Sequence, residues 1–156
     1  MKNPFARILC PVDFDEYAVG AMELACRLAE DSPTVVYLLH VLVPVIPAPE
    51  QIGVPLEPFP LSEPEVRKQL EQLAREHLAG HVKYEVRTGI GDPAHVILGR
   101  IEEIGIDLVI MPTHGRRGLG RMVLGSVAEQ IVRRANCPVM TVRPALAEKA
   151  AKSTGR

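Results

Sequence analysis

The sequence predicts an α/β protein in which one open parallel sheet carries helices on both of its faces. Two observations lead to this prediction. Five short runs rich in Val, Ile and Leu are spaced along the chain, and a stretch with helical periodicity separates each run from the next. An alternating β-α order with right-handed crossovers builds a doubly wound sheet, so the fold class follows from the order of the elements.

The five predicted strands differ in how their apolar residues are arranged. Four are almost continuously apolar, as expected for strands that are covered on both faces. The third alternates apolar and polar residues, so we expect it at an edge of the sheet with one face in solvent. In chain order the predicted strands are Arg7–Val12, Val35–Leu42, Val82–Thr88, Asp107–Met111 and Pro138–Arg143.

Four helices are predicted between these strands, because apolar residues recur there at three- and four-residue intervals. Asp92-Pro93 combines an N-cap residue with proline at the first helical position. Gly105 fits a helix C-terminus, and Ser126-x-x-Glu129 predicts a capping box. The four apolar stripes are Ala18, Ala21, Met22, Ala25, Leu28 and Ala29; Val66, Leu70, Leu73 and His77; Ala94, Ile97, Leu98, Ile101 and Ile104; and Val127, Ala128, Ile131 and Ala135.

Length and composition indicate a single globular domain. The chain has 156 residues, enough for one domain with a substantial core and too few for two ordinary ones. Hydrophobic residues make up 47% and charged residues 24%, which is typical of a globular protein rather than a disordered one. The formal net charge of -1 gives no indication of nucleic-acid binding, so we expect no nucleic-acid partner.

The three cysteines and the apolar runs predict a cytoplasmic protein that does not interact with a membrane. Cys10, Cys26 and Cys137 are widely spaced and form no C-x-x-C pair, which argues against a zinc site or a disulfide framework. We interpret them as buried or unreactive thiols in a reducing compartment. The N-terminus lacks a signal-peptide pattern, and no run reaches the ~18 apolar residues of a membrane span.

Two segments are predicted to be irregular. Val43–Leu61 contains six prolines, each of which removes a backbone donor and restricts φ. It leaves the carboxyl end of the second strand, where it is either a lid over a binding site or a mobile surface loop. The last residues, 145–156, are expected to be a flexible tail, so the predicted domain is 1–144.

The most informative segment for function is Met111–Ser126, which leaves a strand, passes through glycines and arginines, and ends at a helix. Glycines allow backbone amides to approach an anion closely. The following helix offers free N–H groups and the positive end of its dipole. Arg116, Arg117 and Arg121 add positive charge. Together these features predict a phosphate site, the alternative being a flexible loop before an ordinary N-cap.

Several better-known motifs are absent from the sequence. No glycine is followed by lysine, which excludes a Walker A loop. Gly118-x-Gly120 lacks the third glycine of a dinucleotide-binding fingerprint and follows the fourth predicted strand instead of the first. The sequence also contains neither a nucleophile elbow nor H-E-x-x-H. These absences disfavour P-loop and NAD enzymes, and no assembled catalytic triad is evident.

The spacing of the glycines resembles that of the ATP-binding universal stress proteins. Those proteins carry a G-x-x-G element, nine residues and then G-[ST] after the fourth strand, and here Gly115 is followed after nine residues by Gly125-Ser126. Other stretches resemble the family in the same order, so the resemblance covers residues 5 to 144. These stretches are Ile8–Asp13, Leu39–Val41, Gly91–Pro93 and Asn136–Val139.

The resemblance implies a Rossmann-like fold with strand order 3-2-1-4-5 that binds ATP, with or without Mg²⁺. Asp13 and the backbone around Pro11 and Val12 would border the adenine and ribose. Val41 would supply an apolar wall and backbone contacts to the base. Thr113 and Gly115 would lie along the phosphates, and Gly125, Ser126 and Val127 would close the phosphate site. The other residues assigned to the nucleotide site are Met111, Pro112, His114 and Arg116.

Some of these residues also have an ordinary structural interpretation. Asp13 could instead cap the first helix or face solvent in the turn. His114 could contact a phosphate or only cap the turn. His40 lies in an apolar strand and is expected to be a satisfied core residue rather than a ligand. Pro112 stands where the family's first glycine would be, so any contact through that amide is lost.

Four functions remain open from the sequence. The first is a stress-response or signalling module that binds ATP with little or no hydrolysis, because no general base is evident. The second is a module for AMP or cyclic AMP. The third is a nucleotide-free dimeric scaffold, favoured by Pro112 and disfavoured by Gly125-Ser126. The fourth is a phosphotransferase. The resemblance also implies a homodimer through the last strand, Pro138–Arg143.

Overall fold

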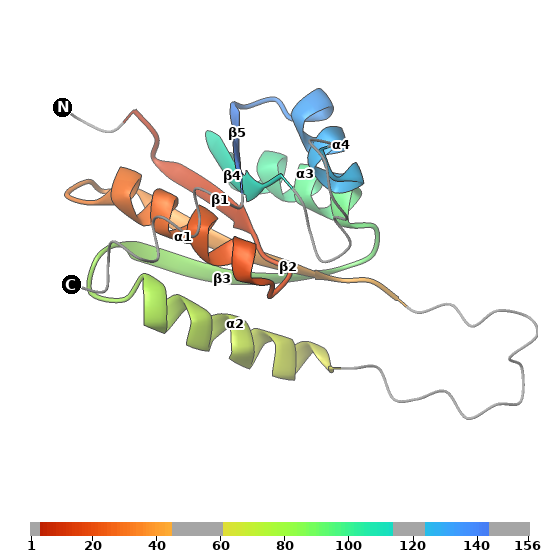
Figure 1. The fold of residues 1–156 in the computed structure, drawn as a ribbon, viewed down its shortest axis with the longest axis horizontal. Helices are drawn as coiled ribbons and strands as arrows, with labels where there is room; N and C mark the ends of the chain where they lie inside the picture. The colour runs from red at the N-terminus through yellow and green to blue at the C-terminus, as the bar shows by residue number, and fades with distance from the viewer. Residues whose placement is uncertain (1–3, 45–60, 114–123, 144–156) are drawn as a thin grey trace, which may run out of the picture.

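The computed structural model describes residues 4–44, 61–113 and 124–143 and confirms the predicted fold class (Figure 1). Its five strands form one sheet in the order β3-β2-β1-β4-β5, and all neighbouring strands are parallel. The strands are β1 (Arg7–Pro11), β2 (Val35–Leu42), β3 (Lys83–Ile90), β4 (Leu108–Pro112) and β5 (Val139–Val142). The helices are α1 (Glu16–Ala29), α2 (Glu63–His77), α3 (Pro93–Ile104) and α4 (Ser126–Arg134).

The sheet has a buried layer on each face, as a doubly wound fold requires. Helices α1 and α2 lie on one face, and α3 and α4 lie on the other (Figure 1). Because side chains alternate along a strand, Ile8 and Cys10 of β1 enter the first layer while Leu9 enters the second. All three are fully buried, which explains why the central strands are continuously apolar.

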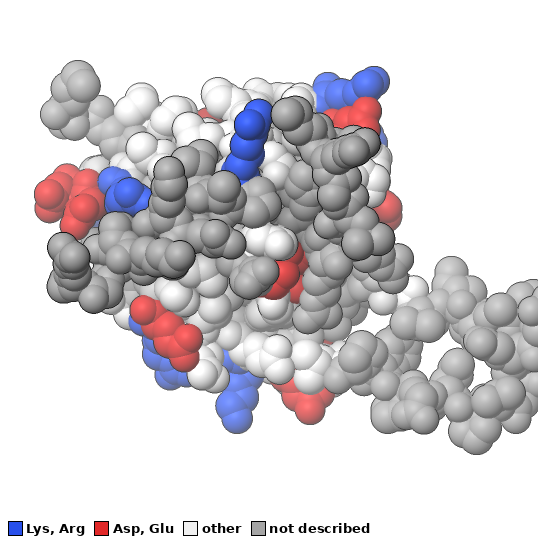
Figure 2. All heavy atoms as spheres, viewed as in Figure 1, with Lys and Arg blue, Asp and Glu red and all other residues white. Residues whose placement is uncertain are grey.

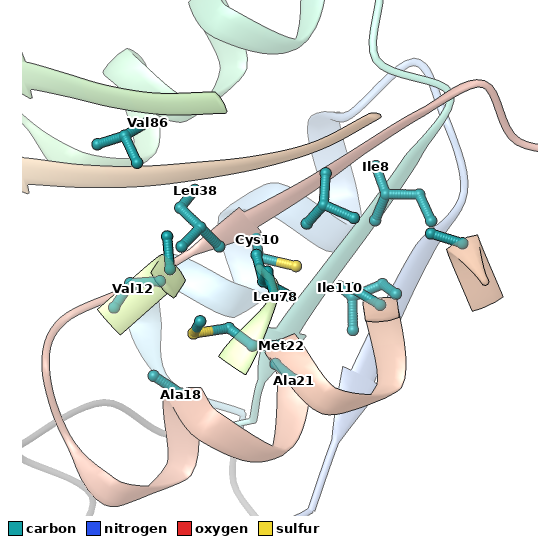
Figure 3. Packing of buried hydrophobic residues seen from close by; sticks show 14 of the residues in the cluster. Ile8, Cys10, Val12, Ala18, Ala21, Met22, Leu38, Leu78, Val86 and Ile110 are labelled. Carbon is teal, nitrogen blue, oxygen red and sulfur yellow. The ribbon is translucent and has the colours of Figure 1, made fainter. Parts of the chain in front are cut away.

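The cysteines are not paired in the structure. The Cys10 side chain lies within the α1–α2 layer near Met22 and Leu78 (Figure 3), and its complete burial raises the pKa of the thiol. Cys26 and Cys137 are also free and are half-buried. The absence of disulfides among these three residues agrees with the prediction from their spacing.

The ends of the elements differ from the sequence predictions where distant parts of the chain meet. Strand β3 extends to Ile90 because its whole length pairs with β2. Strand β4 begins at Leu108 instead of Asp107. The Asp107 carboxylate accepts hydrogen bonds from the Ala6 and Arg7 amides, at 3.0 and 3.2 Å, and so joins the start of β4 to the start of β1.

Helix caps were predicted correctly for α3. The Asp92 side chain accepts a hydrogen bond from the His95 amide at 2.9 Å, and Gly105 ends the helix with a φ of 70°. Helix α2 begins with a capping box that was not predicted, in which the Ser62 amide donates to the Glu65 carboxylate at 2.8 Å. Its signal, S-x-x-E, is present in the sequence.

The predicted capping box at Ser126 is wrong. The N-cap of α4 is Gly125, and Ser126 is already the first helical residue. The Gly125 carbonyl accepts a hydrogen bond from the Glu129 amide, at 2.8 Å. The Glu129 carboxylate instead pairs with Arg133, one turn further along the helix, at 3.0 Å. The start of α4 is therefore not capped by a side chain.

The proline-rich segment and the tail lie largely outside the described residues, as 45–60 and 144–156. Within the ranges that the structure does describe, no helix combines the length and the apolarity that crossing a membrane requires. Figure 2 shows acidic and basic side chains of the described residues in small groups on the face in view, without a large area of one sign.

Candidate functional site

Strands β1 and β4 stop pairing near their carboxyl ends because both reach a proline. Their register pairs Leu9 with Val109 as its last rung. Backbone groups alternate in direction along a strand, so Pro11 of β1 and Pro112 of β4 direct their nitrogens toward each other's strand. Neither nitrogen carries a hydrogen, so the next two hydrogen bonds of the ladder cannot form. A crevice therefore opens where the strand order reverses, the usual ligand site of such sheets.

A cleft of about 630 Å³ occupies this position, within the usual size range of small-molecule sites. All the predicted site residues that the structure describes line it, whereas His114, Gly115 and Arg116 lie outside the described residues. The predicted residues lining the cleft are Pro11, Val12, Asp13, Val41, Met111, Pro112, Thr113, Gly125, Ser126 and Val127.

The cleft has further lining residues that the sequence analysis did not assign to it. They come from the carboxyl end of β2 and from one face each of α3 and α4. Alternation along β2 places Leu39 on the same face as Val41, and the i, i+4 spacing in α3 places Pro93 on the same face as Ile97. Neither pattern shows that β2 and α3 meet at one cleft. The added residues are Leu39, His40, Val43, Pro93, Ile97 and Ala128.

One end of the cleft is formed by the N-terminus of α4. The Gly125 amide donates to the Thr113 carbonyl at 2.8 Å, which holds the start of the helix beside the end of β4. The first intrahelical bond comes from the Glu129 amide, so the amides of Ser126, Val127 and Ala128 have no acceptor within the helix. Three free N–H groups and the positive end of the helix dipole make this end suitable for an anion.

The other end of the cleft is formed by the turn between β1 and α1 and by the end of β2. The His40 Nδ1 lies 2.6 Å from the Val12 carbonyl oxygen. The His40 ring also packs against Phe14, with their centroids 4.7 Å apart. His40 is therefore satisfied, as expected, but it is half-buried and lines the cleft instead of lying in the core.

Two carboxyl groups meet in the β1–α1 turn. Asp15, not Asp13, is the N-cap of α1: its Oδ1 accepts hydrogen bonds from the Tyr17 and Ala18 amides at 3.1 and 2.9 Å. The alternative role of Asp13 as the helix cap is thus wrong. The pKa of Asp15 is raised to about 6, first by burial and then by the negative charge of Asp13. The two side chains are also hydrogen-bonded to each other. The pair therefore holds a proton at mildly acidic pH.

This carboxyl pair predicts a stability that falls as the pH rises. The pKa of Asp15 in the folded protein is above its ordinary value of 3.8, so the native state binds more protons than the unfolded state between pH 3.8 and about pH 6. Stability should then decrease from about pH 4 to about pH 7. Asp15→Asn retains an oxygen that can cap α1 and removes the charge, so it should flatten this dependence. Thermal unfolding measured across that range tests the expectation.

Asp15→Ala distinguishes the effect of the Asp15 charge on stability from the effect of its hydrogen bonds as the N-cap of α1. It also removes the carboxylate but leaves two amides without their acceptor, which should lower stability by about 1 kcal/mol relative to Asp15→Asn throughout the range. An Asp15→Asn protein with the pH slope of the wild type would exclude this pair as its source.

Among the described residues, no three His, Cys, Asp or Glu side chains form a group that could hold a metal ion.

Comparison with known proteins gives a consistent result. The model of the Universal stress protein family matches residues 4–143. Universal stress protein MJ0531 of Methanocaldococcus jannaschii is 31% identical over 146 residues, which are 91% of this chain and 84% of that protein.

Two solved structures share the fold. A universal stress protein in complex with cAMP has a TM-score of 0.65 and 17% identity, over 89% of this chain and 97% of that one. A universal stress protein family protein from Arabidopsis thaliana with AMP bound has a TM-score of 0.57 and 22% identity, over 88% of this chain and 91% of that one. At these identities the likeness establishes the architecture alone.

Proposed function

Because the chain belongs to the universal stress protein family, we propose that it is a cytosolic stress-response or signalling module that binds ATP in the cleft between β1 and β4. The observation that carries the proposal is the composition of the two ends of this cleft. Free helix amides lie at one end, and a carboxylate with apolar strand residues lies at the other. This arrangement matches a ligand with an anionic end and a flat, largely apolar end.

At the phosphate end, the amides of Ser126, Val127 and Ala128 would donate to phosphate oxygens. Thr113 and Gly125 lie beside them, joined by the hydrogen bond between the Gly125 amide and the Thr113 carbonyl. That bond occupies the Gly125 amide, so we assign the anion contacts to the three amides that follow it. His114, Gly115 and Arg116 are proposed to complete this end.

At the base end, Leu39, Val41 and Met111 offer apolar surface to an adenine ring. The Asp13 carboxylate lines the same part of the cleft and would accept hydrogen bonds from ribose hydroxyls, which are donors that every adenosine nucleotide has. The solved structures of this fold with AMP and cAMP support an adenine nucleotide as the ligand class.

Little or no hydrolysis is proposed. In the described part of the cleft, the end that would hold the phosphates is lined by backbone amides and the hydroxyls of Thr113 and Ser126, without a His, Asp or Glu side chain. A general base is needed to activate water or a hydroxyl nucleophile efficiently. We therefore propose a binding module rather than a phosphotransferase.

The proposal is tested by calorimetric titration of the purified, nucleotide-stripped protein. ATP with Mg²⁺, ATP with a chelator, AMP and cyclic AMP are titrated in parallel. We expect ATP to bind with micromolar affinity and AMP more weakly, because AMP lacks two of the phosphates that the helix amides would contact. Tighter binding of AMP or cyclic AMP would favour the second function. No binding of any nucleotide would favour the nucleotide-free scaffold.

Replacing Asp13 with alanine should weaken the binding of ATP and AMP by a similar factor. A hydrogen bond to a charged group contributes about 1.5–3 kcal/mol, so the loss should be about tenfold or more. Asp13→Asn is the matched control, since it keeps an acceptor and should lose less affinity. The measurement is the same titration. If Asp13→Ala spared AMP while losing ATP, the carboxylate would act at the phosphate or metal end instead.

We further propose a homodimer through β5. This strand is at the edge of the sheet, and edge strands leave a row of backbone groups unpaired. Its Met140 is 38% exposed, and Val132 of the neighbouring α4 is 48% exposed. Pairing with a second copy would satisfy the edge and cover these side chains.

A further inference from the structure

We propose that His40 is a positioning residue: its imidazole draws the Val12 carbonyl out of the β1–β2 ladder and so leaves the Val41 backbone amide open to the base of the bound nucleotide. The inference rests on the proposed function, because it assigns a role at the base end of the same cleft. It concerns how the sheet is kept open there, and two of its tests do not need a bound nucleotide.

The direction of the Val41 amide follows from the ladder on each side of β2. The Leu42 carbonyl accepts from the Gly91 amide on the side of β3, and the Leu39 carbonyl accepts from the Val12 amide on the side of β1. Because backbone groups alternate along a strand, Val41 directs its amide and carbonyl toward β1, as Leu39 does. In a regular parallel ladder, the next acceptor for the Val41 amide would be the Val12 carbonyl.

That rung does not form. The Val12 carbonyl is instead paired with the His40 Nδ1 at 2.6 Å, and the parts of the chain that the structure describes offer the Val41 amide no other acceptor. A carbonyl oxygen only accepts, so Nδ1 must be the protonated ring nitrogen. A side chain of β2 thus replaces the backbone of β2 as the partner of the Val12 carbonyl.

The turn after β1 is arranged around this contact. Phe14 has a φ of 61°, a left-handed conformation that a bulky residue rarely adopts. Its ring packs on the His40 ring at a centroid distance of 4.7 Å. The strained turn and the ring contact both hold the imidazole against Val12, so the diverted carbonyl is part of a built arrangement rather than a fraying strand end.

The consequence is a donor left open in the cleft. Val41 lines the cleft, and an amide without an acceptor away from water is costly. A ring nitrogen of a purine is an acceptor that fits a single backbone donor on an apolar wall. Without the imidazole, the Val12 carbonyl is free to complete the rung with Val41, which would remove this donor from the ligand.

The first test is hydrogen exchange of the Val41 amide in the nucleotide-free protein. We expect fast exchange in the wild type and protection in His40→Leu, where the rung closes. His40→Asn is the conservative control, because its side-chain amide can donate from a position close to that of Nδ1, and it should keep the exchange fast. A protected Val41 amide in the wild type, or equal exchange in all three proteins, would overturn the proposal.

The second test is the tautomer of His40 from ¹⁵N spectra of the imidazole near neutral pH. We expect the proton on Nδ1, which is the less common tautomer of a free imidazole. A proton on Nε2 alone would overturn the proposal. Both this test and the exchange test can be interpreted even if the protein binds no nucleotide, so they separate a failure of this inference from a failure of the proposed function.

The third test is affinity. His40→Leu should weaken ATP and AMP alike by about fivefold, the equivalent of one neutral hydrogen bond, and His40→Asn should restore binding to within about twofold of the wild type. An unchanged affinity in His40→Leu, with ATP bound normally by the wild type, would contradict the inference while leaving the proposed function in place.

Discussion

Replacing Gly125 with valine should lower the affinity for ATP by about 100-fold while leaving the fold intact. Gly125 has φ and ψ of -58° and 152°, which valine can adopt, and its amide and carbonyl bonds do not depend on its side chain. A branched side chain at this N-cap adjoins the three free amides and blocks the approach of a phosphate. Losing two charge-assisted hydrogen bonds costs about 3 kcal/mol, which corresponds to the stated factor.

Calorimetric titration with ATP measures this effect, and thermal unfolding establishes that the variant is folded. Gly125→Ala is the matched control, because a single methyl group should reduce the affinity less. AMP should lose less affinity than ATP in Gly125→Val, since most of the blocked contacts belong to the outer phosphates. An unchanged ATP affinity in a folded Gly125→Val protein would rule out the start of α4 as the phosphate site.

Replacing Thr141 with proline should convert the proposed homodimer into monomers. The carbonyls of Pro138 and Val142 accept from β4, so Val139 and Thr141 direct their backbone groups outward, toward the free edge. Proline at position 141 removes an outward donor and spares the β4–β5 ladder, which is why edge strands tolerate this residue. Sedimentation should then give the 17.1 kDa monomer instead of twice that mass.

Thr141→Val is the control for this substitution, because it changes the side chain and keeps the amide. It should remain a dimer at the same concentration, and circular dichroism of Thr141→Pro should show the wild-type content of helix and strand. A wild-type protein that sediments as a monomer, or a Thr141→Pro protein that stays dimeric, would mean that β5 is not the interface.

Features within a few residues of each other were predictable from the sequence. Asp92 and Gly105 were correctly placed at the ends of α3, because a cap depends on amides and carbonyls one turn away. The order of strands and helices followed from hydrophobic periodicity, and the family resemblance supplied the strand order that the structure confirms. The position of the cleft at the carboxyl ends of the strands followed from that order.

The errors occurred where one distant residue decides the local outcome. Ser126 and Glu129 have the pattern of a capping box, but the Thr113 carbonyl holds the Gly125 amide, and the helix begins one residue earlier than the pattern suggests. Asp107 was predicted to begin β4, yet its carboxylate accepts hydrogen bonds from the Ala6 and Arg7 amides at the start of β1. Neither partner can be identified from local sequence.

The sequence by itself determined the fold class and the edge of the sheet at which the described site residues gather, because periodicity, caps and glycine spacing are local properties. Only the tertiary structure decided the register that brings Pro11 and Pro112 together at the end of the β1–β4 ladder and sets His40 against the Val12 carbonyl. These residues are far apart in the chain and meet only when the sheet forms. The opening of the cleft is therefore a property of strand pairing, which periodicity alone does not specify.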